Sequence, residues 1–196
     1  MAVITISRQL GSAGNYIASL LASMLSYSLV NKESIVMEAQ RRGVIEMEDV
    51  DAIGEGKLSL LHRFIKNKSQ AIYAMRSIMR ETVMEGNAVV VGRGGCMELK
   101  ERTDLFNVRI IAPFDIRVAR IRQENGVDRA QAVKMLKQSD KEQAEYVKHF
   151  FLVDLSDPEL YDIVVNTGRI SPDASARLIT QAMRQVSGLK NPSEGG

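Results

Sequence analysis

The chain has 196 residues, 45% of them apolar and 26% charged, which is ordinary for a globular protein with one α/β domain. Its formal net charge of +2 is too small to indicate a nucleic-acid partner, and no apolar run approaches the roughly 18 residues of a membrane span. A single cysteine, Cys96, excludes an internal disulfide and a multi-cysteine metal site, and His62 and His149 are too far apart in sequence to indicate a metal site. We therefore expect a cytoplasmic protein with no membrane or nucleic-acid partner and no metal-chelating cluster, and the composition leaves its oligomeric state open.

The first half of the chain begins with a predicted strand over residues 2–7, rich in Val, Ile and Thr. A turn of small residues follows, and then an amphipathic helix whose apolar residues recur at i, i+3, i+4 and i+7: Ile17, Leu20, Leu21 and Met24. The patterns at 32–42 and 58–85 predict two further helices, joined by a polar connection.

The second half alternates strands and helices in the same way. Apolar runs predict strands at "AVVVGRGG" (88–95), "VRIIA" (108–112) and "DIVVNTG" (162–168). The intervening and final segments predict an arginine-rich helix after Pro113, a charged helix over about 128–150 and a closing helix over about 172–186. Short apolar strands alternating with helices predict an α/β fold with a parallel sheet covered by helices on both faces. Ligands bind such sheets beyond the carboxyl ends of the strands.

The turn after the first strand is a candidate anion site. Gly11, Ser12, Ala13 and Gly14 are small enough for successive backbone N–H groups to turn inward, and the next helix adds its free N–H groups and dipole. Asn15 and Tyr16 follow at once and complete the candidate nucleotide-binding set. The same composition also suits a tight turn that meets no ligand.

Several motifs resemble, in their order and spacing, those of the cytidylate kinase-like branch of P-loop nucleotide kinases. That branch carries "SR", then "GS-G-G" and a polar residue, and the matching segments here are Ser7-Arg8 and Gly11-Ser12-Ala13-Gly14-Asn15. The similarity continues in "VVVGRGG", "ENGV", "SDKEQAEYVKHFF", "DPELYDIVVNTGRIS" and the last helix, so it covers nearly the whole chain. It implies a P-loop nucleotide kinase-like fold in one domain, 1–187, with a helical lid at about 118–150 and a flexible tail at 188–196.

The resemblance also implies an activity, the transfer of a phosphoryl group from ATP to a nucleoside monophosphate or another small acceptor. Mg²⁺ would be held mainly through phosphates and water. The general P-loop pattern is GxxxxGK followed by Ser or Thr. In this chain Arg8 stands in place of the first Gly, Gly14 stands in place of the Lys, and Asn15 stands in place of the Ser or Thr that ligates Mg²⁺. The aspartates that flank "GR" in cytidylate kinases are Val91 and Gly94 here. These replacements favour an alternative function, a non-catalytic nucleotide- or anion-binding regulatory protein with the kinase fold.

Five arginines are the candidate catalytic residues, and each also has a structural interpretation. The planar fork of Arg8 can grip phosphate oxygens, or it can be a solvated loop side chain. Arg93 lies between glycines at a strand end, where the resemblance implies that it faces the acceptor phosphate; it could instead pair with a carboxylate. Arg117, Arg120 and Arg122 share one stretch of helix at the edge of the implied lid, and can close over triphosphate charge or form a solvated helix face.

Asn166 follows the last strand, where the resemblance implies contact with the adenine; its amide can equally cap the local turn. In the implied lid, related kinases carry "D--R--Y", and this chain keeps Asp140 and Tyr146 but has Gln143 in place of the arginine. The segment 30–43, in the expected acceptor region, has no base-reading pattern, so the sequence does not name the acceptor.

Overall fold

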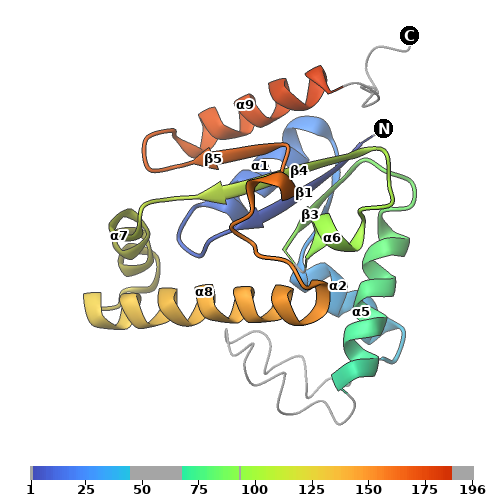
Figure 1. Ribbon diagram of the computed structural model, residues 1–196, viewed down its shortest axis with the longest axis horizontal. Helices are drawn as coiled ribbons and strands as arrows, with labels where there is room; N and C mark the ends of the chain where they lie inside the picture. The colour runs from blue at the N-terminus through green and yellow to red at the C-terminus, as the bar shows by residue number, and fades with distance from the viewer. Residues whose placement is uncertain (1, 45–67, 93, 187–196) are drawn as a thin grey trace. The chain divides into compact units, whose positions relative to one another are not determined.

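A parallel sheet lies at the centre of the fold (Figure 1). The computed structural model describes residues 2–44, 68–92 and 94–186. Within them, five strands form one sheet in the order β2-β3-β1-β4-β5, with the bounds β1 (Val3–Arg8), β2 (Ser28–Val30), β3 (Ala88–Val91), β4 (Leu105–Ile111) and β5 (Ile163–Asn166). β1 pairs in parallel with both β3 and β4, and β4 pairs in parallel with β5. The predicted α/β class is confirmed.

The chain divides into two compact units, which we describe separately. The described part of the first, residues 2–29 and 86–186, holds β1 and β3–β5 with the helices α1 (Gly14–Leu25), α6 (Gly95–Glu98), α7 (Phe114–Asn125), α8 (Arg129–Phe151) and α9 (Pro172–Gln185). The described part of the second, residues 30–44 and 68–85, holds α2 (Lys32–Arg41) and α5 (Lys68–Thr82). There α2 packs on α5, and the guanidinium of Arg42 binds both Glu38 and Glu81.

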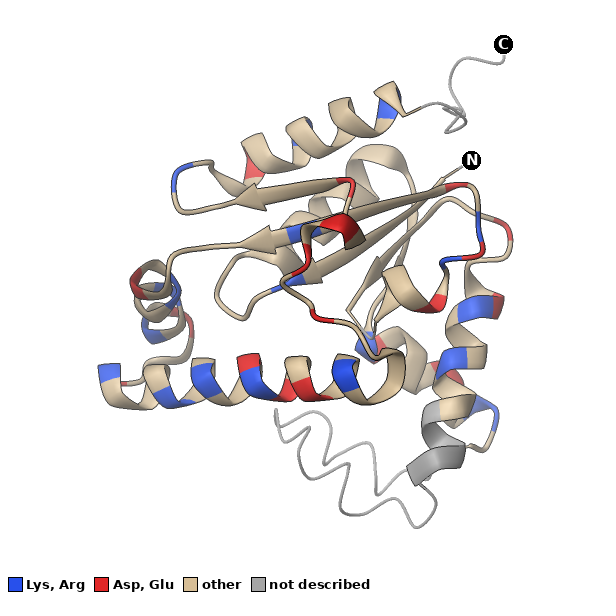
Figure 2. Ribbon diagram, in the orientation of Figure 1, with Lys and Arg blue, Asp and Glu red and all other residues tan. Residues whose placement is uncertain are grey.

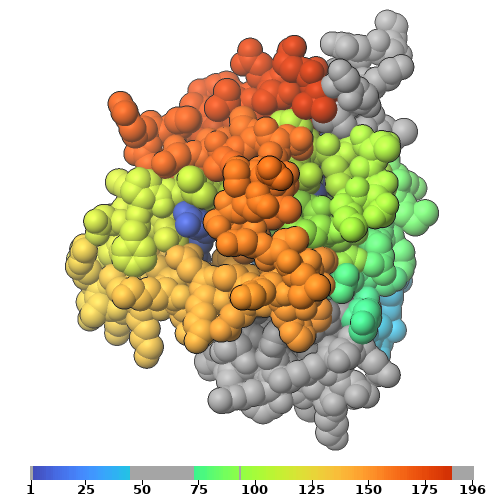
Figure 3. Space-filling model, viewed as in Figure 1, coloured from blue at the N-terminus to red at the C-terminus, as the bar shows by residue number. Residues whose placement is uncertain are grey.

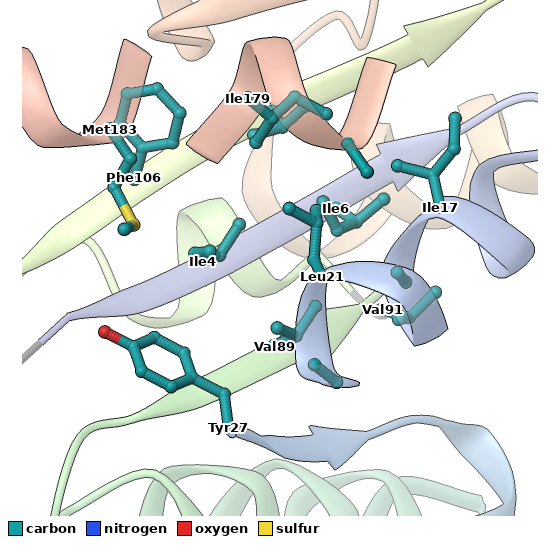
Figure 4. Close-up of a cluster of buried hydrophobic side chains, with 14 of the residues drawn as sticks. Ile4, Ile6, Ile17, Leu21, Tyr27, Val89, Val91, Phe106, Ile179 and Met183 are labelled. Carbon is teal, nitrogen blue, oxygen red and sulfur yellow. The ribbon is translucent and has the colours of Figure 1, made fainter. Parts of the chain in front are cut away.

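One face of the sheet carries the main hydrophobic core of the first unit (Figure 4). Side chains alternate along a strand, so Ile4 and Ile6 of β1 face the same side. Helices α1 and α9 cover them, the first with Ile17 and Leu21 and the second with Ile179 and Met183. This packing fixes the direction of α1, and therefore the position of the loop that precedes it.

The opposite face of the sheet is more polar. There Thr5 Oγ1 donates a hydrogen bond of 2.6 Å to Asn107 Oδ1. Nη1 of Arg109 donates another, also of 2.6 Å, to Ser7 Oγ. The short helix α6 covers this face with Cys96 and Met97, which share a cluster with Val147 of α8. Helices therefore cover both faces, as the alternation of elements predicts.

Helices α7 and α8 are joined by a short turn and share a small core, and we call them the α7–α8 hairpin. Gly126, in the left-handed conformation, ends α7, and the Asp128 side chain caps α8 by accepting from the backbone N–H of Gln131. Leu10, from the loop after β1, packs against this core. The core consists of four buried residues from the two helices: Val118, Ile121, Ala132 and Leu136. The charged positions in the first half of α8 are all basic, whereas its second half mixes acidic and basic residues (Figure 2). The hairpin is thus attached to the loop through Leu10.

Some element bounds differ from the sequence-based expectation. The third predicted strand, at 108–112, begins earlier, at Leu105, because Phe106 and Val108 alternate into the core with Ile110. The patterns of β2 and α6 are too short to predict. Of the helix predicted at 58–85, residues 58–67 lie outside the described residues, as does the predicted tail. Within the part of the chain that the structure describes, no helix is both long and apolar enough to cross a membrane.

Candidate functional site

A short loop, residues 9–13, joins the carboxyl end of β1 to the first residue of α1. Two of its residues take the left-handed backbone conformation, Gly11 with φ of +74° and Ala13 with φ of +63°. Ala13 is the N-cap of α1 and offers no side-chain cap, so N–H groups of the first helical turn are left for water or a ligand. An anion here would meet these N–H groups and the positive end of the helix dipole.

One hydrogen bond within the loop, and bonds to the residues that follow two other strands, hold the loop in place. The Ser12 side chain is buried, and its Oγ donates to the carbonyl of Gln9 at 2.7 Å. Gln9 Oε1 accepts from the backbone N–H of Ala112, just after β4, at 3.1 Å. Thr167, buried after β5, donates from Oγ1 to the carbonyl of Ser12 at 2.8 Å. The loop is therefore anchored by the two strands that lie beside β1 on one side of the sheet.

Arg120 of α7 connects this anchored loop to the α7–α8 hairpin. Its guanidinium donates to the carbonyl of Gly11 at 3.2 Å, to Thr167 Oγ1 at 2.9 Å and to the Thr167 carbonyl at 2.7 Å. The side chain is half-buried and lines the cavity described below. Its positive charge is thus fixed beside the loop without an acidic partner among these contacts.

Arg117, one turn earlier on α7, has a different environment. Its side chain is only 5% exposed, and its two terminal nitrogens donate to the two carboxylate oxygens of Asp140 on α8, each at 2.9 Å. The guanidinium carbon also lies 5.4 Å from the centre of the Phe114 ring, and one nitrogen lies 3.4 Å from the Leu10 carbonyl. Arg117 therefore joins the two helices of the hairpin to each other and to the loop.

The loop, α7 and α8 enclose a cavity of about 530 Å³, within the size range of small-molecule sites. In Figure 3 the N-terminal part of the chain, in blue, is visible in a hollow beside these yellow helices. The wall combines loop residues, the start of α1 and one face of the hairpin: Arg8, Gln9, Leu10, Gly11, Ala13, Gly14, Asn15, Tyr16, Arg120, Glu124, Ser139 and Gln143. Two arginines against one glutamate give the wall a net positive charge, which suits an anion.

The side chain of Arg8 reaches the start of α1. Its Nε donates a hydrogen bond of 2.9 Å to Oδ1 of Asn15. Asn15 occupies the position at which the P-loop pattern has the Ser or Thr that ligates Mg²⁺. Its side-chain oxygen, Oδ1, already accepts a hydrogen bond from the positively charged guanidinium of Arg8. Among the described residues there is also no cluster of His, Cys, Asp and Glu that could hold a metal ion. These residues do not fit a metal ion ligated directly by the loop.

The structure therefore brings together seven of the predicted site residues around one cavity: Arg8, Gly11, Ala13, Gly14, Asn15, Tyr16 and Arg120. It places Ser12 beneath the loop, with its hydroxyl turned to the backbone. Arg122 is exposed on α7 and is not among the residues of the cavity wall. Asn166 is exposed, and its Oδ1 accepts from the backbone N–H of Gly168 at 2.9 Å, which is the turn-capping arrangement. Arg93 lies outside the described residues.

Sequence reasoning did not assign a site role to the residues that support the loop or line the α8 side of the cavity. Thr167 and Gln9 have no distinctive sequence signal, although Thr167 follows Asn166 in the motif "NTG". Ser139 shares a helix face with Gln143, four residues later on α8, and sequence reasoning noted Gln143 only as the replacement for the arginine in "D--R--Y". Cys96 is buried, and burial raises the pKa of its thiol to about 11, which makes it unsuited to nucleophilic chemistry.

Comparisons with known proteins agree with this architecture. The model of the cytidylate kinase-like family matches residues 3–169. The cytidylate kinase of Methanopyrus kandleri is 24% identical to this chain, over 97% of each protein. The cytidylate kinase of Sulfurisphaera tokodaii is 22% identical, over 90% of this chain and 92% of the relative.

Solved structures show the same fold at low sequence identity. A protein from Eubacterium ventriosum, described as uncharacterized, superposes with a TM-score of 0.75 at 22% identity, over 95% of this chain and all of the other. The shikimate kinase of Bacteroides thetaiotaomicron superposes with a TM-score of 0.57 at 12% identity, over 93% of this chain and 98% of the other. The fold is that of the P-loop kinases, and the match over most of its length shows that the chain belongs to the cytidylate kinase-like family.

Proposed function

We propose that the protein is an ATP-dependent phosphotransferase that moves a phosphoryl group to a nucleoside monophosphate or another small acceptor. The observation that carries the proposal is the cavity of about 530 Å³ whose wall combines the N–H groups at the start of α1 with Arg8 and Arg120. Phosphoryl transfer needs positioning and charge neutralisation more than covalent chemistry, and this wall offers both. Family membership supports the same reaction type.

The residues divide into three proposed roles. The loop residues and the first turn of α1 bind the triphosphate through backbone N–H groups, and Arg8 and Arg120 add formal positive charge. Arg93, which follows Gly92 in the sequence, is proposed to contact the acceptor phosphate. Arg122 on the exposed face of α7 is proposed to reach the phosphates only when the hairpin α7–α8 closes as a lid.

Mg²⁺ enters the proposal as an ion carried by the nucleotide. Mg²⁺ keeps several waters and binds proteins through few ligands, so phosphate oxygens and water can supply its coordination here. The lone buried cysteine fits a reducing compartment, and a cytoplasmic location is part of the proposal.

The test is a transfer assay with ATP, Mg²⁺ and each common nucleoside monophosphate, with diphosphate products separated by chromatography. We expect one or more acceptors to be phosphorylated and Arg93→Ala to lose this activity while keeping the thermal stability of the wild type. Arg177→Ala is the matched control, because Arg177 is an exposed arginine on α9 that is not part of the cavity wall. Equal activity in the wild type and Arg93→Ala would remove the role proposed for Arg93.

A second function is favoured by one observation: the loop has neither the lysine nor the metal-ligating hydroxyl of an ordinary P-loop. It is a regulatory protein that binds a nucleotide or another anion without transferring phosphate. ATP binding in calorimetry, together with no product from any acceptor, would favour this function over the enzyme. Crystals grown in sulfate would also show whether an anion occupies the amides of residues 11–15.

A further inference from the structure

Two departures from the P-loop pattern are connected by one short distance. Arg8 stands where the pattern has its first Gly, and Gly14 stands where it has Lys. A Cβ atom on Gly14 would lie 2.4 Å from Cβ of Arg8 and 2.7 Å from its Cγ. Real Cβ atoms essentially never come within 3.0 Å of another heavy atom in this way. Side chains at both positions would therefore force the backbone or a side chain to shift.

A second glycine accommodates the far end of the arginine. A Cβ on Gly92, which follows β3 with φ of +73°, would lie 2.6 Å from Nη1 of Arg8. The side chain thus runs from β1 across Gly14 to Gly92, and its Nε binds Asn15 Oδ1 on the way. The wall of the cavity includes both Arg8 and Gly14.

We propose that Arg8, at the end of β1, supplies the positive charge that the general pattern supplies through a lysine at the start of the helix. The two replacements, Arg8 for Gly and Gly14 for Lys, are sterically coupled, and together we call them the exchange. Arg8 binds the triphosphate in place of the loop lysine, and Gly14 is a positioning residue that leaves room for the stem of Arg8. The role in binding rests on the proposed function, whereas the steric coupling of positions 8 and 14 does not.

The exchange also accounts for the third departure from the pattern. Asn15 has an oxygen acceptor at the metal-ligand position, and Arg8 occupies it. The loop therefore presents a guanidinium beside the position at which the general pattern has its metal-ligating hydroxyl. Binding of ATP to the loop should accordingly depend little on Mg²⁺.

The first test measures steric coupling by thermal unfolding without nucleotide. Gly14→Ala in the wild-type background should lower the Tm by roughly 4–10 °C, because it overpacks the contact with Arg8. In the Arg8→Gly background the same substitution should leave the Tm unchanged or raise it slightly, since Ala favours a helix over Gly. In the Arg8→Ala background the Cβ of residue 8 remains, so the loss should persist. Equal Tm changes in all three backgrounds would overturn the coupling.

The second test measures ATP affinity by calorimetry, with Mg²⁺ and with excess EDTA. Arg8→Gly should weaken binding about tenfold to a hundredfold, the usual effect of losing charge-assisted hydrogen bonds. Gly14→Lys alone should bind no better than Arg8→Gly, because its side chain has no room beside Arg8. The double variant Arg8→Gly/Gly14→Lys has the arrangement of the general pattern and should regain most of the affinity. Arg177→Ala controls for the loss of an exposed arginine.

The outcomes separate the inference from the proposed function. A double variant that binds ATP no better than Arg8→Gly would overturn the exchange even if the wild type binds well. Wild-type affinity that falls more than about tenfold in EDTA would contradict the metal-independent contact. A wild type that binds no ATP would refute the proposed function and the binding role of Arg8, and the thermal test would still decide whether positions 8 and 14 are coupled.

Discussion

The ion pair between Arg117 and Asp140 should be a principal stabiliser of the α7–α8 hairpin, and Asp140→Asn tests it. The substitution keeps the shape of the side chain but removes its charge and one of two acceptors. Arg117, 5% exposed, would then be a buried cation with a neutral partner. Removing one partner of a fully buried pair costs about 3–5 kcal/mol. Because the Asp140 side chain is 36% exposed and partly screened, we expect about 2–3 kcal/mol.

Thermal unfolding followed by circular dichroism measures this effect. For a chain of this size, a loss of about 2–3 kcal/mol lowers the Tm by roughly 4–12 °C. Glu145→Gln is the matched control on the same helix, because Glu145 pairs with Lys141 at 3.7 Å and both side chains are more than 60% exposed. The control should shift the Tm by no more than about 2 °C. If Asp140→Asn and the control behave alike, the pair does not hold the hairpin together.

Three further predictions concern the loop and the buried thiol. Leu10→Ala should destabilise the protein by about 1–2 kcal/mol in urea unfolding, since half-buried Leu10 packs on the α7–α8 core, and no change would contradict that contact. Thr167→Val should lower the free energy of unfolding by about 1–3 kcal/mol, because the Ser12 carbonyl and Arg120 lose the hydroxyl that they bind. Thr167→Ser keeps the hydroxyl and should keep the wild-type stability, so equal losses in the two variants would refute its role. Cys96, whose burial raises its thiol pKa to about 11, should react with a thiol reagent at pH 8 far more slowly in the native protein than in urea, and equal rates would show that the thiol is accessible.

Sequence alone predicted the parts of the protein that depend on local patterns. Alternating apolar strands and amphipathic helices require a covered parallel sheet, because each element must bury its apolar face against another. Small residues between the first strand and helix predicted a tight turn there and made it a candidate anion site; the structure shows a turn with two left-handed residues, Gly11 and Ala13, and anion binding stays a prediction. The order of the motifs was sufficient to identify the family resemblance, since that comparison needs no distances.

Only the tertiary structure determined which arginine of α7 is buried in an ion pair and which one lines the cavity. Arg117 and Arg120 are three residues apart and share a helix face in sequence, yet Arg117 is buried against Asp140 and Arg120 lines the cavity through contacts with Gly11 and Thr167. Those partners lie between 23 and 109 residues away along the chain, and no local pattern records which of them a long side chain will reach. The contact between Arg8 and Gly14 spans six positions, but it depends on the angle at which α1 leaves β1. That angle is set by the packing of Ile17 and Leu21 against the sheet.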